Sequence, residues 1–98
     1  MDIRQLVYFV TTVEEKTVTS AAEKLHMTQP PLTMQLHMLE DELGCKLFRR
    51  EGRTLSLTDA GQHFYIRALE IIGMCDSVKS EMGDYQSGNA GELRIGAI

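Results

Sequence analysis

Apolar residues recur every three or four positions in four stretches of the chain, and this spacing predicts four helices. The first helix is expected over residues 2–15. Its apolar stripe consists of Ile3, Leu6, Val7, Val10 and Val13. Tyr8 and Phe9 flank the stripe, and we expect them to pack in the core and at its rim. The chain therefore begins with an amphipathic helix whose apolar face needs a second element to cover it.

A second, shorter helix is expected to bury Ala21, Ala22 and Leu25. Because alanine side chains are small, they let another helix pack closely. Three hydroxyl residues are candidate caps for this helix, and one of them stands at capping-box spacing from Glu23. These candidates are Thr17, Thr19 and Ser20, the last of which has the capping-box spacing. A short turn at His26 and Met27 leads into the third helix.

The third helix is expected from Gln29 to about Leu43, with the Thr28 hydroxyl as its N-cap. Two prolines follow in the first turn, where a missing N–H costs little. Its apolar stripe consists of leucines at spacings of four, three and four, which are Leu32, Leu36, Leu39 and Leu43. Gly44 is expected to end the helix. Two short helices, a tight turn and a capped second helix make a helix-turn-helix.

The opposite face of the third helix is short, neutral and polar or sulfur-bearing, with no acid before Glu40. A surface helix usually carries more charge, so this face is suited to approach the edges of DNA bases. The residues expected to contact DNA from this helix are Thr28, Gln29, Pro30, Pro31, Thr33, Met34 and His37. Gln29 can give adenine two hydrogen bonds. The Thr33 methyl can touch a thymine methyl.

A strand pair is predicted at residues 46–50 and 54–57, joined by a turn at Glu51, Gly52 and Arg53. A basic two-stranded ribbon directly after a helix-turn-helix is typical of a wing, although an ordinary solvated hairpin is the alternative. Arg49, Arg50 and Arg53 are expected to hold the DNA backbone or enter the minor groove.

A long helix is expected from a cap at Thr58 to about Gln86. Its apolar positions alternate at spacings of four and three, which is a heptad seam. The seam, expected to form a dimer interface, consists of Phe64, Ala68, Ile71, Cys75, Val78, Met82 and Tyr85. Tyr65, Leu69 and Ile72 widen it enough to touch a core as well. The pattern does not determine whether the paired helices are parallel or antiparallel.

Glycines at 88 and 91 interrupt the helical pattern, and the alternation at Leu93 and Ile95 predicts the first strand of a domain that this chain lacks. The pattern thus divides the chain into a winged helix-turn-helix at 1–57, a linker or dimerisation helix at 58–87 and a hinge at 88–98. The predicted fold class is mainly α.

Composition adds limits to this interpretation. The net charge of −4 argues against nucleic acid at first sight, but Lys46, Arg49, Arg50 and Arg53 are clustered with only Glu51 among them. Cys45 and Cys75 are too few for a disulfide scaffold and fit a reducing cytoplasm. The chain has no signal peptide or membrane span by pattern.

No catalytic motif, metal site or cofactor site emerges from the pattern. The histidines do not share a face or turn with one another or with the cysteines, and a zinc site needs convergent ligands. No nucleophile has a neighbouring base in a recognisable motif. We therefore expect no enzymatic activity and no cofactor in this chain.

The order of these elements resembles the LysR-type transcriptional regulators. The motifs that carry the resemblance are Tyr8-Phe9-Val10, Ala21-Ala22-Glu23-Lys24-Leu25, Thr28-Gln29-Pro30-Pro31-Leu32-Thr33, Leu39-Glu40, Leu47-Phe48-Arg49-Arg50, Leu57-Thr58-Asp59-Ala60-Gly61 and Gly91-Glu92-Leu93-Arg94-Ile95-Gly96. The resemblance implies a cytoplasmic, bacterial, sequence-specific DNA-binding regulator. It also implies a homodimer, often a tetramer, with a missing domain that binds a small-molecule inducer.

The chain departs from this family pattern at several positions. The family commonly has a basic residue where Met34 stands and often another near His37, and it often has glycine at Lys16 and an aromatic residue at Val18. The loss of a base-reading arginine keeps a second function open, namely a protein-interaction module on a winged-helix fold with weakened DNA binding.

Overall fold

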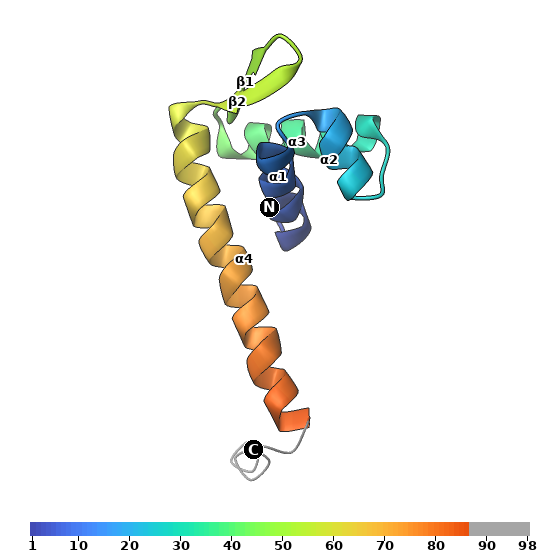
Figure 1. Ribbon diagram of the computed structural model, residues 1–98. Helices are drawn as coiled ribbons and strands as arrows, with labels where there is room; N and C mark the ends of the chain where they lie inside the picture. The colour runs from blue at the N-terminus through green and yellow to red at the C-terminus, as the bar shows by residue number, and fades with distance from the viewer. Residues whose placement is uncertain (87–98) are drawn as a thin grey trace.

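The computed structural model describes residues 1–86 and has a helical head with a projecting hairpin and a long helical stalk (Figure 1). The elements in order are α1 (Ile3–Glu15), α2 (Val18–Lys24), α3 (Gln29–Leu43), β1 (Phe48–Glu51), β2 (Thr54–Leu57) and α4 (Asp59–Gln86). The predicted class, mainly α with a winged helix-turn-helix and a long following helix, is confirmed. The predicted hinge and strand at 88–98 lie outside the described residues.

Phe9 is the centre of the hydrophobic core. Its ring has no exposed surface and lies 5.3 Å from the ring of Phe48 on β1 and 5.0 Å from that of Phe64 on α4. One side chain of α1 thus joins the hairpin and the stalk. Leu6 and Val10 of the predicted stripe are buried and Val13 packs against the core, whereas Ile3 is exposed. Phe9, expected to flank the stripe and pack in the core, is fully buried beside Phe48 and Phe64, so the buried face of α1 is centred nearer to Phe9 than predicted.

The start of α2 corrects the predicted capping box. The Thr17 hydroxyl is the cap, accepting a hydrogen bond of 3.1 Å from the N–H of Ser20, which lies inside the helix. Ala21 and Ala22 are buried, as predicted, and Leu25 is partly buried. These small side chains let α2 pack against both α1 and α3.

Helix α3 crosses the head and buries Leu32, Leu36 and Leu39, as predicted. Leu43 was predicted to join them but is 36% exposed. Gly44 ends the helix in the left-handed conformation at φ 75°, and the chain turns away there, which leaves Leu43 at the margin of the core.

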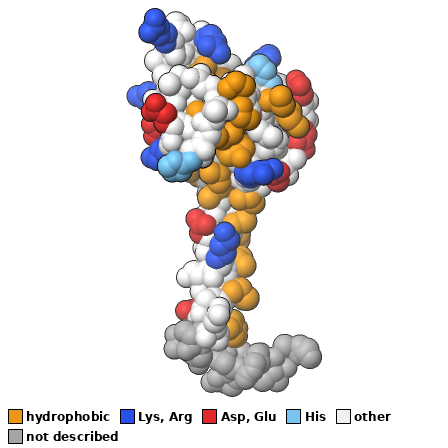
Figure 2. All heavy atoms as spheres, turned by 90° about the vertical axis from the view of Figure 1, so that its right-hand side faces the viewer, with side chains coloured by type: hydrophobic (Ala, Val, Ile, Leu, Met, Phe, Trp, Pro, Cys, Tyr) orange, Lys and Arg blue, Asp and Glu red, His pale blue; other side chains and the backbone are white. Residues whose placement is uncertain are grey.

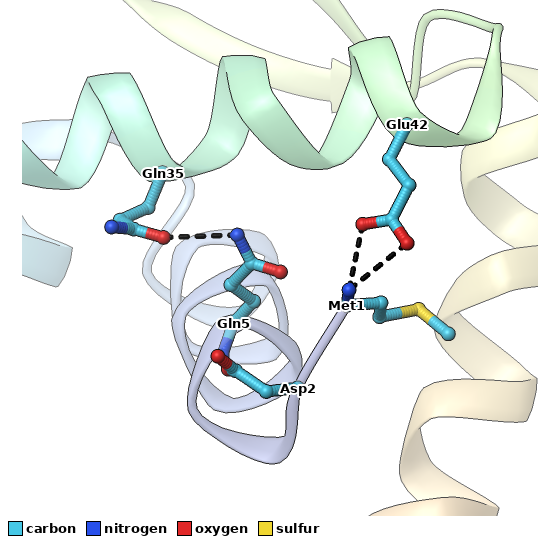
Figure 3. A network of polar contacts seen from close by, with 5 residues as sticks. All are labelled: Met1, Asp2, Gln5, Gln35 and Glu42. Carbon is cyan, nitrogen blue, oxygen red and sulfur yellow. Dashed lines mark hydrogen bonds and ion pairs between the residues drawn. The ribbon is translucent and has the colours of Figure 1, made fainter.

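The N-terminus of α1 is joined to α3 by polar contacts (Figure 3). The side-chain amide of Gln5 donates to the Gln35 side-chain carbonyl at 2.9 Å, and the Met1 amine lies 2.7 Å from the Glu42 carboxylate. Asp2 caps α1 by accepting from the Gln5 backbone N–H at 2.8 Å. These contacts fix the inner side of α3 against α1.

The hairpin is antiparallel and starts at Phe48, two residues later than predicted. Glu51 pairs with Thr54, so the turn consists of Gly52 and Arg53 alone. The hairpin is also tied to the end of α1, because the Leu55 N–H donates to the Lys16 carbonyl at 2.9 Å. Lys16 is in the left-handed region at φ 69°, where glycine has no steric cost. This conformation gives a physical reason for the glycine that the family often has there.

Helix α4 begins as predicted at Thr58, whose hydroxyl accepts from the Gly61 N–H at 3.0 Å. Two residues of the predicted dimer seam pack inside the head. Ala68 has no exposed surface, so its assignment to a dimer interface is wrong, and Phe64 packs against Phe9. The first turns of α4 therefore cover the core of their own domain, and only the later heptad positions stay open to solvent.

Farther along α4, the Tyr65 hydroxyl donates to the Glu14 carboxylate at 3.3 Å. Burial, followed by the charge and hydrogen bond of Glu14, raises the pKa of Tyr65. None of the helices within residues 1–86 has the length and apolar character needed to cross a membrane.

Gly61 is the position in α4 where a side chain is least tolerated. A Cβ there would collide with the carbonyl oxygen of Leu47, whereas a Cβ at Gly73 on the same helix would meet nothing. We predict that Gly61→Ala destabilises the fold by about 1–3 kcal/mol or more. Gly73→Ala should instead stabilise it by about 0.5–1 kcal/mol, because alanine lowers the entropy cost of helix formation. Urea unfolding of both variants measures the two effects, and equal stabilities would contradict the close packing.

Candidate nucleic-acid interface

The outer face of α3 is open to solvent, as its polar pattern predicts. Met34 is 60% exposed, Gln29, Pro30 and His37 are exposed, and Thr33 is partly buried. A shallow hollow lies on this face, lined by Gln29, Pro30, Thr33, Met34, His37, Met38 and Asp41. The face therefore presents amide, hydroxyl, thioether and imidazole groups, with Asp41 as the first acid along it.

Thr28 occupies the N-cap position of α3, but its predicted capping hydrogen bond is absent. An N-cap side chain bonds the N–H of the second or third helical residue. In α3 these residues are Pro30 and Pro31, which have no N–H. The Thr28 hydroxyl is exposed and makes no hydrogen bond within its own helix start, which leaves it available to an outside group.

A groove separates the N-terminal ends of α2 and α3 from the hairpin. It is lined by Thr17, Val18, Thr19, Ser20, Gln29, Thr33, Arg50, Gly52, Arg53 and Leu55. The structure therefore brings together predicted residues from α3, Gln29 and Thr33, with predicted arginines of the hairpin, Arg50 and Arg53. A second hollow continues between α3 and β1 and includes His37, Lys46 and Arg50.

Six predicted residues do not line this groove: Pro30, Met34 and His37 line the hollow on α3, whereas Thr28, Pro31 and Arg49 line neither. Arg49 neighbours Arg50 on β1, and successive side chains of a strand point to opposite faces, so Arg49 lies on the other face of the ribbon. Pro31 is exposed but lines neither the groove nor the hollow on α3. Its place in the first turn fits a conformational role.

The hairpin arginines are free to act on an outside anion. Arg49, Arg50 and Arg53 form no ion pair with another residue in the described part of the chain. Lys46 differs, because its amine lies 3.8 Å from the Glu40 carboxylate. The positive field of the hairpin therefore comes mainly from the three arginines.

Sequence reasoning missed the hydroxyl residues of α2 as part of this groove. Thr17, Thr19 and Ser20 were considered only as caps, and all three line it. Their number could have indicated a second role. A seven-residue helix needs one N-cap, and the hydroxyls of the other two residues then need another explanation.

A separate apolar surface runs along the stalk. Between residues 73 and 86, no hydrophobic side chain of α4 packs against the core of the head, and Figure 2 shows hydrophobic side chains continuing down one side of the helix. Of the predicted seam, Ile71 is 37% exposed, and Cys75 is partly buried. The remaining members, Val78, Met82 and Tyr85, are exposed together with Met74, which the heptad spacing did not include.

Within residues 1–86, no three His, Cys, Asp or Glu side chains converge as they would around a metal ion. The groove itself offers the amide of Gln29, the hydroxyls of Thr17, Thr19, Ser20 and Thr33, and the guanidinium groups of Arg50 and Arg53, which suit hydrogen bonding and charge interactions.

Comparison with known proteins identifies relatives of the head. The family model described as bacterial regulatory helix-turn-helix protein, lysR family, matches residues 3–62. The chain is 47% identical over 98 residues to the HTH-type transcriptional regulator BsdA of Bacillus subtilis, covering 99% of this chain and 34% of the relative. It is 41% identical over 98 residues to TfdS of Cupriavidus pinatubonensis, covering 100% of this chain and 33% of the relative. The chain thus spans about a third of the length of these regulators.

Solved structures with the same fold include domains bound to DNA. The structure titled BenM_DBD/benA site 1 DNA complex matches with a TM-score of 0.85 and 41% identity, covering 90% of this chain and 99% of that one. The CbnR_DBD-DNA complex matches with a TM-score of 0.82 and 35% identity, covering 88% and 99%. Full-length BenM matches with a TM-score of 0.77 and 42% identity over 82% of this chain and 26% of that one. The chain belongs to the LysR family of bacterial helix-turn-helix transcriptional regulators.

Proposed function

We propose that this chain is the DNA-binding and dimerisation part of a LysR-type regulator, acting in the cytoplasm on duplex DNA and without enzymatic activity of its own. The observation that carries the proposal is the groove between α3 and the hairpin, which residues of both elements line. Gln29 and Thr33 line it from one side and Arg50 and Arg53 from the other. Groups suited to base edges and groups suited to phosphate thus face one opening.

The proposed contacts follow from the position of each group. The N-terminal half of α3 enters the major groove, where Gln29 pairs with adenine and Pro30 and the Thr33 methyl touch thymine methyls. The exposed Thr28 hydroxyl accepts no capping hydrogen bond from its own helix, so it is available to contact a phosphate or a base. Arg53 at the hairpin tip and Arg50 contact phosphates or the adjacent minor groove. Met34 and His37 lie farther along the same face.

The stalk is proposed to hold two heads together. Its exposed apolar positions from Ile71 to Tyr85 would be covered by α4 of a second copy. A two-fold pair requires a palindromic site with half-sites about one helical turn, or a multiple, apart. Residues 1–57 are then the reading domain, 58–87 the dimer helix and 88–98 the link to an inducer-binding domain outside this chain. The full-length protein would form dimers or tetramers.

A protein-interaction module remains the second candidate function. Met34 and Met38 are 60% and 50% exposed on the face that would read bases, and the chain has a net charge of −4. Both features weaken attraction to DNA and suit a protein partner.

Selection of oligonucleotides from a random duplex pool separates the two functions. The proposal predicts enrichment of a palindrome, and the affinity of the enriched duplex should fall steeply with salt. No enrichment over random duplex at low salt would favour the protein-interaction module.

Arg53 supplies the first test of the proposed contacts. Replacing it with alanine should lower affinity for specific and random duplexes alike, and the slope of log affinity against log salt should shrink by roughly one. Arg67→Ala is the matched control, because Arg67 lies on α4 paired with Glu70 and away from the groove. Fluorescence anisotropy at several salt concentrations measures both slopes. An unchanged slope for Arg53→Ala would exclude a phosphate contact.

Met34 offers a test of base reading. Arginine there could give guanine two hydrogen bonds, which is worth about 1–3 kcal/mol of discrimination, whereas methionine has neither donor nor charge. We predict that Met34→Arg raises affinity for duplex DNA and introduces a guanine preference at one position of each half-site. Met38→Arg adds the same charge one turn farther along α3 and should raise affinity without that preference. Binding to a panel of half-site variants tells them apart, and no change for Met34→Arg would place Met34 off the DNA surface.

The dimer helix is tested at Ile71. Aspartate in an apolar interface leaves a buried charge without a partner, so Ile71→Asp should give monomers. Ile66→Asp is the control, because Ile66 is 58% exposed and lies about 140° around the helix from Ile71. Light scattering over a concentration series gives the mass of each variant. A monomeric parent chain at high concentration would remove the proposed interface.

A further inference from the structure

Glu40, near the end of α3, is the one ionisable side chain that is buried in the described part of the chain, at 7% exposure. One carboxylate oxygen accepts hydrogen bonds from the backbone N–H groups of Leu47 at 2.7 Å and Phe48 at 3.3 Å. The other oxygen lies 3.8 Å from the Lys46 amine. A single side chain of α3 therefore holds the first residues of the hairpin.

Side-chain packing leaves a gap between α3 and the hairpin. A hollow lies between them, lined by residues of α3, the hairpin and α2, with Glu40 at its side. The hairpin also contacts α1 and α4, and the Leu55 N–H donates to the Lys16 carbonyl at the end of α1. In residues 1–86, the hydrogen bonds that join α3 to the hairpin all end on Glu40.

Burying a carboxylate is costly unless charge-assisted hydrogen bonds compensate for the lost hydration. An apolar side chain of similar length would avoid that cost but would leave the N–H groups of Leu47 and Phe48 without an acceptor. The Glu40 carboxylate therefore loses hydration, and in return its hydrogen bonds fix the backbone of Leu47 and Phe48 at the base of the hairpin.

We infer that Glu40 is a positioning residue that sets the hairpin relative to α3, and so couples base reading by Gln29 to phosphate contact by Arg53. This inference rests on the proposed DNA-binding function. A one-residue hydrogen-bonded link is enough because the hairpin is short and Arg53 stands in its turn, where a small rotation at Phe48 displaces the guanidinium most.

A pair of variants of similar size isolates the acceptor. Glu40→Gln keeps an oxygen for Leu47 and Phe48, whereas Glu40→Met fills the space without one. Glu40→Asp keeps the charge, but its side chain is one methylene shorter and moves the carboxylate away from the N–H groups of Leu47 and Phe48. Glu42→Gln controls for the loss of a negative charge on α3, because Glu42 does not contact the hairpin. Each variant is combined with Arg53→Ala and, separately, with Gln29→Ala.

The readout is a double-mutant cycle on duplex DNA, corrected for the folded fraction. In the parent, in Glu40→Gln and in Glu42→Gln, Arg53→Ala should lower the salt slope by roughly one. In Glu40→Met and Glu40→Asp the same change should have little effect, while Gln29→Ala keeps its full effect on base preference. A merely destabilising role would reduce both effects together.

Residual dipolar couplings of the DNA-free protein supply a second readout. The hairpin should be reoriented relative to α3 in Glu40→Met and Glu40→Asp but not in Glu40→Gln. If either of the first two variants does not fold, the other carries the comparison. An unchanged hairpin orientation, or a full Arg53 effect in these variants, overturns the role of Glu40. An Arg53 effect that is absent from the parent while the hairpin reorients in the variants would instead remove the proposed wing contact.

Discussion

The backbone of Leu47 is the joint on which the arrangement of the head depends. Its N–H donates to the Glu40 carboxylate of α3 at 2.7 Å, and its carbonyl accepts from the Thr58 N–H at 3.0 Å at the start of α4. Gly61 lies against that carbonyl, and the Leu47 side chain is 1% exposed in the core. Helix α3, the hairpin and the stalk are therefore joined at one buried residue, in a position that tolerates little movement.

The contacts at Leu47 also explain why separate sequence motifs occur together in this chain. Leu39-Glu40, Leu47-Phe48 and Thr58 to Gly61 lie far apart in the chain, yet they meet here. Glu40 supplies a hydrogen-bond acceptor, and Leu47 supplies a buried residue just before β1. Thr58 caps α4, and Gly61 leaves room for the close approach of the Leu47 carbonyl. The family pattern therefore describes one packing arrangement, and the residues proposed to contact DNA lie on its outer side.

The fold followed from periodicity because its helices are amphipathic and their ends carry clear stop signals such as Gly44. The centre of the buried face of α1 did not follow, since Phe9 and the stripe beside it satisfy helical spacing almost equally, and the positions of Phe48 and Phe64 decide between them. The heptad seam of α4 was read as one interface. Its first two positions, Phe64 and Ala68, pack inside the head itself. Heptad spacing alone does not reveal whether its own domain or a second copy covers an apolar position.

The candidate site was partly visible in the sequence. The neutral face of α3 and the basic hairpin could be predicted because both are local patterns. The free hydroxyl of Thr28 follows from Pro30 and Pro31, but only when cap geometry is considered residue by residue. The burial of Glu40 had no local signal, since its hydrogen-bond partners lie seven and eight residues farther along the chain.

Amide hydrogen exchange at the joint tests this account most directly. If α3, the hairpin base and α4 are one unit, the amides of Leu47 and Thr58 should exchange with the same opening free energy as buried amides of α3 such as Leu39. The amide of Gly52 in the hairpin turn should exchange at a much lower free energy. Exchange of Leu47 at the level of Gly52 would show that the hairpin opens independently, and would contradict a hairpin held rigidly against α3.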